Sequence, residues 1–436
     1  MSINNSVQRP TTGQTKLKRR AFLKTAVSGI ASASFFNLYG CSLNRAKRDL
    51  SGLEGNDGGQ MDLAPGLEYV EIDRNGNTLH DGFTSPGRPD GMGCFQTDSN
   101  TLVLMRNHEI DIDDHGSSDG RGAYPLSKVP DEAYSKTDLG GVSRLVLDAQ
   151  SLAVRHSNMV LSGTRNNCAG GVTPYGWLSC EETLERNSLK NHGYVYLCDA
   201  AAESLQAPQR IDAYGRFVHE AAGFDTKTGK CYLTEDIDAA CLYRFLPDNV
   251  NSPFVGQLQA LGVVGEATFE TTNMKRGDTK PVEWINVPDP LAGINVSKDA
   301  HALGAAVFVR GEGCWFDNGR LVFAATEGGP KKQGQLFLLN DANDKPTLTL
   351  LAQSDEETDI CHPDNVTISP SGEIYFAEDN DGDCLIQRLS ANGSLTVVAR
   401  NRERGEEIAG LCFSPDGAVL FGNIQEPGIT FAIRGF

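Results

Sequence analysis

The chain has too little positive charge to suggest a nucleic-acid-binding protein. Its 436 residues include 39 lysines and arginines against 57 aspartates and glutamates, which leaves a formal net charge of −18. Because a nucleic acid or an anionic membrane surface would repel this charge, neither is an expected partner. The excess of carboxylates is compatible with cation binding, and solubility is the simpler alternative.

The apolar segment near the N-terminus is too short for a membrane span. Residues 26–39 are moderately apolar and sit where the hydrophobic region of a signal peptide belongs. They follow Lys18-Arg19-Arg20-Ala21-Phe22-Leu23-Lys24, which resembles the twin-arginine export motif. We therefore predict a twin-arginine signal peptide at residues 1–41, with the twin-arginine export machinery as a partner and the periplasm or cell surface as the location.

Two forms of the mature N-terminus are compatible with this signal. Leu38-Tyr39-Gly40-Cys41 resembles a lipobox, which would leave an acylated Cys41 and a lipid-anchored protein. Ordinary cleavage without lipidation is the alternative. Residues 42–60 are polar and glycine-rich, so we predict a flexible linker there. One folded domain, expected to be monomeric, should occupy residues 61–436.

A repeated hairpin is the main feature of that domain. In residues 310–329, Glu312 opens an apolar run, Asp317-Asn318-Gly319 forms the turn, and Glu327 closes the returning run. Asn-Gly between two apolar runs is a strong hairpin signal because both residues tolerate positive φ. Five more degenerate copies occur. The six opening positions are Asp90, Asn167-Cys168, Glu220, Glu312, Asp364 and Glu407.

These repeats predict an all-β fold, a six-bladed β-propeller with a metal site at the mouth of its central channel. Three of the five intervals between openers fit the roughly 40–50 residues of one blade. The two longer intervals require insertions, and residues 248–298 are predicted to be one that covers a face. Because a hairpin returns its two ends to one edge, openers and closers should form a ring of acids at one mouth.

Carboxylates placed so close together cannot all stay ionised without protons or cations among them. Calcium takes about six to eight oxygen ligands, and acids and asparagines supply them. Cys168 lies at an opening position, where a thiolate beside carboxylates indicates a softer metal such as iron or zinc. For each acid, a structural role at a turn or in solvent is the alternative. The predicted ring contains Glu109, Glu181, Glu182, Glu220, Glu235, Asp236, Glu312, Asp364, Glu378, Asp379 and Glu407.

Few cationic side chains accompany this ring. Arg310 stands two residues before Glu312 and is suited to grip a phosphate through two parallel hydrogen bonds. A structural salt bridge is the alternative for this arginine. His108 and His219 also flank ring acids, and we take His108 as a second candidate catalytic residue, with a purely structural role left open.

Several of these segments resemble the PhoX family of exported alkaline phosphatases. The resemblance covers roughly residues 62–436. It departs from the family pattern at Gly311, where Arg-Pro-Glu is usual, and at Glu426, where histidine commonly precedes the final Pro-Gly. The matching segments are Asn-Cys-Ala-Gly-Gly-x-Thr-Pro…Cys-Glu-Glu at 167–182, Gly-Arg-Phe-x-His-Glu at 215–220, Arg-x-Glu at 310–312, Pro-Asp-Asn at 363–365 and Ser-Pro-Asp-Gly…Asn-Ile-Gln-x-Pro-Gly at 414–428.

The resemblance implies a six-bladed propeller that holds several calcium and ferric iron ions and hydrolyses small phosphate monoesters. It implies that Cys168, Glu220 and Glu312 bind iron and that Arg310 binds the phosphate. The remaining implied metal ligands are Glu109, Glu181, Asp364, Glu378 and Glu407. Two rival functions are a calcium-dependent propeller esterase or lactonase and a non-catalytic binding propeller that calcium stabilises. Neither rival needs a thiolate ligand.

Overall fold

The computed structural model describes residues 50–55, 59–111, 121–185, 190–355 and 360–436. The predicted signal peptide, Cys41 and much of the predicted linker lie outside these residues. Within them, no helix combines the length and apolarity that a membrane crossing requires.

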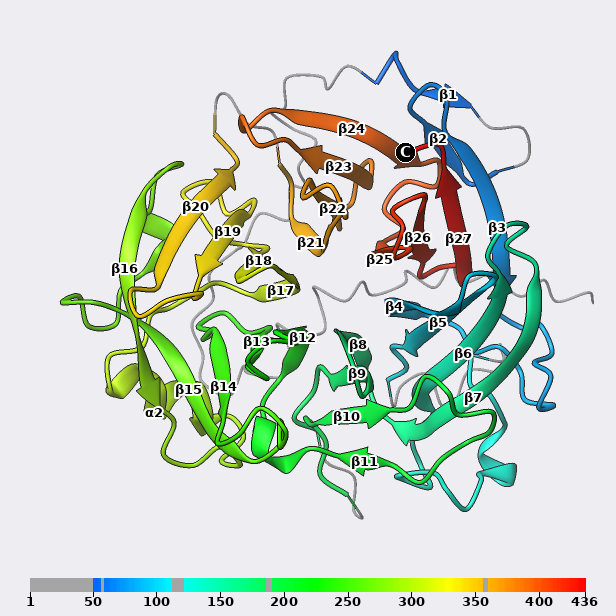
Figure 1. The fold of residues 1–436 in the computed structure, drawn as a ribbon, viewed down its shortest axis with the longest axis horizontal. Coiled ribbons are helices and arrows are strands. Elements are labelled where there is room, and N and C mark those ends of the chain that lie inside the picture. The colour runs from blue at the N-terminus through cyan, green and yellow to red at the C-terminus, as the bar shows by residue number, and fades with distance from the viewer. Residues whose placement is uncertain (1–49, 56–58, 112–120, 186–189, 356–359) are drawn as a thin grey trace, which may run out of the picture. The chain divides into compact units, whose positions relative to one another are not determined.

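A set of inner strands surrounds a common axis (Figure 1), and the contacts between strands identify six of them. Each one contacts the next around the axis, and the last contacts the first, so together they close a ring. In ring order they are β4 (Pro89–Asp98), β8 (Asn167–Thr173), β12 (His219–Phe224), β17 (Gly311–Asp317), β21 (Pro363–Ile368) and β25 (Ile408–Phe413). We call these six the inner strands. They correspond to the six hairpins predicted from the sequence.

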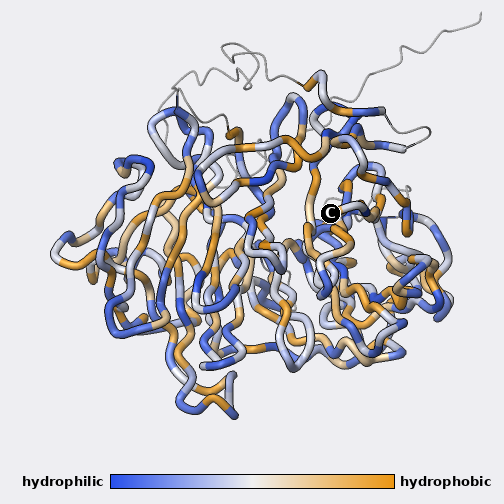
Figure 2. Tube along the Cα trace, turned by 45° about the horizontal axis from the view of Figure 1, so that its top comes forward, coloured by the Kyte–Doolittle hydropathy of each residue, from blue (hydrophilic) through white to orange (hydrophobic). Residues whose placement is uncertain are grey.

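Each inner strand begins an antiparallel series that extends outward. Figure 2 shows apolar residues recurring along these strands, while hydrophilic residues are frequent at the turns. The outer strands are β5 (Thr101–His108), β6 (Gly140–Asp148), β7 (Val154–Thr164), β9 (Gly176–Glu181), β10 (Val195–Cys198), β11 (Gln209–Arg210), β13 (Cys231–Glu235), β14 (Tyr243–Pro247), β15 (Gly256–Val263), β16 (Thr279–Asn286), β18 (Arg320–Ala325), β19 (Gln335–Asn340), β20 (Thr347–Gln353), β22 (Ile374–Glu378), β23 (Leu385–Leu389), β24 (Leu395–Asn401), β26 (Val419–Ile424) and β27 (Ile429–Arg434).

The predicted all-β, propeller-like fold is confirmed, but the prediction of six separate blades is wrong as stated. Hydrogen bonding divides the strands into five sheets. One of them has nine strands, because β16 pairs with β20 and thereby joins the series that starts at β12 to the series that starts at β17. Residues 248–298, predicted to be an insertion over one face, instead contribute β15 and β16, followed by the start of α2 (Asn295–Ala302).

Strands from the start of the described chain complete two of the sheets. β3 (Glu68–Arg74) pairs with β27, and β2 (Met61–Leu63) pairs with β24. β1 (Glu54–Gly55) pairs with β2, although it falls within residues 42–60, for which the sequence predicted a linker. Both ends of the folded domain are therefore held by strand pairing. The short 3₁₀ segments are η3 (Leu126–Lys128), η4 (Asp212–Tyr214) and η5 (Thr271–Asn273).

Glycines allow the inner strands to approach one another. A Cβ atom at Gly91 would lie 2.4 Å from the Cα of Ala169, and one at Gly313 would lie 2.7 Å from the carbonyl oxygen of Asp364. Real Cβ atoms do not come so close to backbone, so a larger residue at these positions would push neighbouring strands apart. Small residues on the inner strands therefore follow from crowding around the axis.

A buried arginine ties β3 to the sheets beside it. Arg106, on β5, donates hydrogen bonds to Asp73 (2.9 Å), Ser143 (3.0 Å) and Thr430 (2.6 Å). These residues belong to β3, β6 and β27. Burial alone would raise the pKa of Asp73, but the charge of Arg106 and hydrogen bonds from Ser85 and Asn77 outweigh it and lower this pKa. The ion pair therefore stabilises the contact of β3 and β27 with β5.

Replacing Arg106 with methionine should lower the free energy of unfolding near pH 7 by about 3–5 kcal/mol, because Asp73 would remain a buried charge without its cation. The deficit should shrink as the pH falls through the lowered pKa of Asp73, since a protonated carboxyl gains little from Arg106. Denaturant unfolding at several pH values measures both effects. The double change Arg106→Met, Asp73→Asn should recover part of the loss, and a deficit that does not vary with pH would contradict this account.

Candidate metal centre

All six inner hairpins carry a β-bulge at the same place, near the start of the inner strand. The irregular steps in strand register are Pro89/Met92, Asn167/Gly170, His219/Ala222, Gly311/Cys314, Pro363/Val366 and Ala409/Cys412. A bulge inserts an extra residue and re-aims the side chains beside it. The first residue inside each of the six bulges is Asp90, Cys168, Glu220, Glu312, Asp364 and Gly410. Five of the six therefore carry a side chain that can bind metal.

Side chains on neighbouring elements hold these bulges in place. Asn107, on β5, donates to the carbonyl oxygens of Cys168 (2.9 Å) and Ala169 (2.8 Å). Asn423, on β26, donates to the carbonyl oxygen of Asp90 at 2.6 Å. Each asparagine thus donates hydrogen bonds to carbonyl oxygens that the bulge takes out of the regular hydrogen bonding between strands. The oxygen of the Asn107 amide accepts a hydrogen bond from the indole N–H of Trp177 at 2.8 Å, so this amide is engaged on both sides.

The bulge residues converge with acids that follow the second strands. Four overlapping groups bring their ligand atoms within 4.8 Å of one another inside each group. The groups are Asp90, Glu109 and Cys168; Cys168, Glu182 and Glu220; Glu220, Glu312 and Asp364; and Asp364, Asp379 and Glu407. Since consecutive groups share a member, the nine residues form one continuous arc. We call these nine residues the donor cluster.

Cys168 lies between two carboxylates in this arc. Its thiol is 3.2 Å from Oε1 of Glu220 and 3.5 Å from Oδ1 of Asp90. The side chain is buried even though it stands at the strand's bulge and not in an apolar run. The other described cysteines that the structure shows as free are also buried, and their apolar settings raise the pKa of several, including Cys94 and Cys412. Those cysteines behave as small hydrophobic residues.

Neighbouring acids at the ends of second strands point in different directions. Glu181, the last residue of β9, accepts hydrogen bonds from the backbone N–H of Gly193 (2.9 Å) and Tyr194 (3.2 Å) and contacts Nδ1 of His192 at 2.7 Å. Burial would lower the pKa of His192, but its hydrogen bonds to Asp138 and Glu181 raise it to about 9. A protonated His192 therefore compensates Glu181.

Glu378 and Glu235, like Glu181, are the last residues of second strands and are buried. Glu378 accepts hydrogen bonds from the backbone N–H of Cys361 (2.8 Å) and from the amide of Gln387 (2.7 Å). Burial raises the pKa of Glu235 to about 7. Side chains alternate along a strand, so the residue after each of these acids faces the other way. That next residue is Glu182, Asp379 or Asp236.

Six of the eight predicted metal ligands lie in the donor cluster, and two do not. Cys168, Glu220, Glu312, Glu109, Asp364 and Glu407 are brought together. Glu181 and Glu378 are outside every such group found among the described residues. Their neighbours Glu182 and Asp379 take the places expected of them, and Asp90 joins as a member that was predicted only as an opener. The alternation of side chains along a strand indicates that only one acid of each adjacent pair faces the site. It does not show which one, because the bulge shifts the strand register.

Arg310 is held beside the cluster by three charge-assisted hydrogen bonds. Its Nε and Nη2 donate to the two carboxylate oxygens of Asp236 at 2.8 and 2.6 Å, and Nη2 also donates to Glu312 at 2.9 Å. Nη1 lies 3.7 Å from Glu327, which is longer than a hydrogen bond. The predicted structural salt bridge and the predicted position beside the metal ligands are thus both present.

His108 does not lie in the cluster, contrary to its predicted catalytic place. It is fully buried, with Nδ1 3.0 Å from the carbonyl oxygen of Gly87 and Nε2 2.8 Å from the hydroxyl of Ser143. Burial, together with the nearby charge of Arg106, lowers its pKa well below the usual value. His219 is similar, because burial lowers its pKa to about 3. Both histidines precede cluster or bulge acids and point to the opposite face of the strand.

Gln425, which closes the sixth hairpin, also belongs to the site. Its amide donates to Oδ2 of Asp90 and, at 2.7 Å, to Oε2 of Glu109. It follows β26 in the position that Glu109 occupies after β5. The hairpin whose bulge carries Gly410 thus lacks an acid at its closing position as well. There Gln425 donates hydrogen bonds to acids of the donor cluster, whereas other hairpins contribute a carboxylate at this position.

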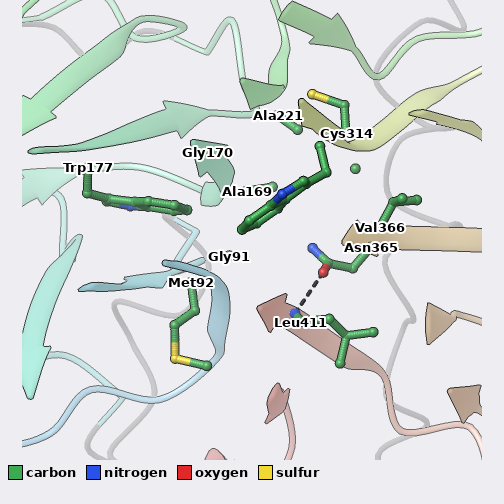
Figure 3. A pocket seen from close by; sticks show the side chains of 12 residues that line it. Gly91, Met92, Ala169, Gly170, Trp177, Ala221, Cys314, Asn365, Val366 and Leu411 are labelled. Carbon is green, nitrogen blue, oxygen red and sulfur yellow. Dashed lines mark hydrogen bonds between the residues drawn. The ribbon is translucent and has the colours of Figure 1, made fainter. Parts of the chain in front are cut away.

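Beyond the donors, the axis is lined by the next residues of the inner strands (Figure 3). Gly91, Ala169 and Ala221 each follow a bulge residue of the cluster, and Trp177 reaches in from β9. The Asn365 side chain accepts a hydrogen bond from the backbone N–H of Leu411 at 2.7 Å. The lining is mostly apolar, so the charged groups are concentrated at the end of the axis where the inner strands begin.

The chemistry of the donor set fits bound cations. Eight carboxylates and one thiol, set within 4.8 Å of their neighbours in each group of three, repel strongly when ionised, and cations relieve this repulsion. Carboxylate oxygens suit calcium, and a sulfur donor suits a softer transition metal. Arg310 adds a fixed positive charge at the edge of such a site.

Several solved structures resemble this protein at low sequence identity. A gluconolactonase from Xanthomonas campestris has a TM-score of 0.43 at 11% identity, over 84% of this chain and 97% of its own. A virginiamycin B lyase from Staphylococcus aureus has a TM-score of 0.37 at 12% identity, over 84% of this chain and 98% of its own. A streptogramin B lyase has a TM-score of 0.42 at 11% identity, with coverage of 84% and 97%. No curated protein sequence matches the chain.

The family model of the alkaline phosphatase PhoX matches residues 148–428. This range includes five of the six inner strands and seven of the nine donor-cluster residues, from Cys168 to Glu407. Asp90 and Glu109 precede it, and the structure brings them to the same cluster. Because the match spans most of the chain, the protein belongs to the PhoX alkaline phosphatase family.

Proposed function

We propose that this protein hydrolyses small phosphate monoesters outside the cytoplasm, using several calcium and ferric iron ions held by the donor cluster. The observation that carries the proposal is the placement of Arg310, which Asp236 and Glu312 hold beside an arc of carboxylates and one thiol. A phosphomonoester is a dianion, so it needs both compensating cations and a directed cationic side chain.

Each group of donors has a distinct part in this proposal. Cys168 and Glu220, which share one donor group, would hold iron together with Glu312, which shares the next group with Glu220. The other cluster acids would hold calcium. When bound, these ions supply charge neutralisation and Lewis-acid activation for phosphoryl transfer. A calcium-only lactonase or binding module would have no use for the thiol.

Arg310 would bind the phosphoryl oxygens and stabilise the charge that develops on them. Its Nε and Nη2 are engaged by Asp236 and Glu312, which fixes the plane of the guanidinium before substrate arrives. The phosphoryl group would meet the guanidinium where it borders Glu312 of the donor cluster. A preorganised donor of this kind needs no reorganisation during the reaction.

The twin-arginine motif supports export, and we propose the periplasm or the cell surface as the location. Export in the folded state would let the protein leave the cytoplasm with its ions already chosen. Lipid anchoring at Cys41 and release as a soluble monomer are the two forms that the signal allows.

Replacing Cys168 with alanine should remove iron and lower phosphatase turnover by at least about 100-fold, because the thiol is the only soft donor in the cluster. The matched control is Cys198→Ala, since Cys198 is buried on β10 and belongs to no donor group. Elemental analysis of the exported protein and hydrolysis of p-nitrophenyl phosphate measure the two effects. Normal turnover and iron content in the Cys168 variant would refute the iron assignment.

The pair Glu181 and Glu182 separates metal binding from folding. Glu182→Gln should lower metal content and activity while leaving the stability of the metal-free protein nearly unchanged. Glu181→Gln should keep the metals but lose about 1–3 kcal/mol of unfolding free energy, because it weakens the hydrogen bonds to His192 and to buried backbone groups. Elemental analysis and denaturant unfolding in chelator test this. The reverse pattern would show that the first acid of the pair is the ligand.

Replacing Arg310 with lysine or glutamine should lower kcat/KM for p-nitrophenyl phosphate by about 10²–10³-fold in both variants. Lysine should not rescue activity because it cannot reproduce the planar pair of hydrogen bonds to Asp236. Arg388→Gln, on the outer strand β23, is the matched control and should retain activity. Wild-type kinetics in the lysine variant would exclude a directed guanidinium role.

A further inference from the structure

Four residues at the site adopt a backbone conformation that side-chain-bearing residues rarely take. Arg88, Asn166, Arg310 and His362 have φ values of 45°, 45°, 54° and 52°. Each stands two positions before a bulge residue of the donor cluster, namely Asp90, Cys168, Glu312 and Asp364. Such conformations cost of order 1–3 kcal/mol and persist where the surroundings impose them. Their recurrence indicates one structural position, repeated around the ring beside the donor cluster.

Arginine occupies this position twice, on opposite sides of the ring. Arg88 precedes β4 and Arg310 precedes β17, and these two inner strands are three steps apart in a closed ring of six. Both guanidinium groups contact site carboxylates: Nη2 of Arg88 donates to Glu109 at 3.1 Å, while Arg310 contacts Asp236 and Glu312. Each arginine therefore flanks a different part of the donor cluster.

The two arginines differ in exposure. Arg310 makes three hydrogen bonds to two carboxylates and has a side chain that is 10% exposed. The Arg88 side chain is 23% exposed, and Glu109 is its partner in an ion pair. Arg88 thus lies closer to solvent at the rim of the same site. It also lies outside residues 148–428, which match the family model.

Arg310 and Arg88 contact different acids of the donor cluster, so a ligand whose phosphoryl group meets Arg310 would present another part to Arg88. We propose that Arg88 binds a second anionic group, a phosphate or carboxylate on the alcohol portion of the substrate. The preferred substrates would then be phosphate monoesters that carry two anionic groups. This inference rests on the proposed phosphatase function, and it makes Arg88 a specificity residue of the same site.

Glycerol 3-phosphate and 3-phosphoglycerate test this directly, because they differ mainly by a carboxylate in place of an alcohol. We expect Arg88→Gln to lower kcat/KM for 3-phosphoglycerate by about 10- to 100-fold, the effect of losing a hydrogen bond between charged groups. The loss for glycerol 3-phosphate should be several times smaller, and Arg88→Lys should recover part of the difference. Equal losses on both substrates, or no loss on either, would overturn the proposal.

Binding provides a readout that does not depend on turnover. The non-hydrolysable pair is 3-phosphonopropionate and propylphosphonate, titrated calorimetrically into the exported, metal-loaded protein. The wild type should bind the carboxylated compound at least about tenfold more tightly, and Arg88→Gln should remove this preference. Arg121→Gln, which removes an arginine paired with Glu426 at 3.1 Å, is the control and should retain it.

These two experiments distinguish the failure of each proposal. Absence of hydrolysis of any phosphate ester by the metal-loaded wild type would refute the phosphatase function. Lack of preference for 3-phosphonopropionate in the wild type, or a preference that survives Arg88→Gln, would refute the role of Arg88 whatever the catalytic result.

Discussion

The bulge at the start of each inner strand is the constraint on which the site depends. In a regular strand, consecutive side chains alternate between faces. The extra residue in each bulge breaks this alternation and turns one side chain toward the end of the axis. Asn107 and Asn423 hold the displaced carbonyl groups of Cys168 and Asp90. The buried hydrogen bonds from these two asparagines thus help to set where the side chains of the donor cluster come together.

Charge compensation explains the division between acids that face the site and acids that do not. Glu181 is compensated by His192 and by backbone N–H groups, and Glu378 is engaged by a backbone N–H and an amide. These acids brace the ends of second strands. The acids of the donor cluster instead stand close to one another, so their compensation comes from Arg88, Arg310 and, in our proposal, bound cations. The same residue type therefore performs structural and ligand roles at adjacent positions.

The six hairpins share one design but not one function. Five bulges carry a donor, while the sixth carries Gly410, whose Cβ would lie 2.3 Å from the carbonyl oxygen of Asp90. That close approach excludes a larger residue and leaves the arc of donors open beside Gln425. The joining of two strand series through β16 and β20 is a second departure from symmetry. The first departure comes from the close approach of Gly410 to Asp90 and the second from pairing between outer strands, and repetition in the sequence does not reveal such contacts.

The sequence by itself determined the all-β class, the six hairpins, the concentration of acids at their ends, the singular position of Cys168 and the resemblance to the family. These follow from local patterns: apolar alternation, turn residues and the spacing of motifs. Only the tertiary structure decided that Glu182 and Asp379 face the site in place of Glu181 and Glu378, that His108 points into the interior, and that Arg88 stands opposite Arg310. The direction of a side chain near a bulge depends on strand register and on the partner strands. Contacts between residues far apart in the chain set both.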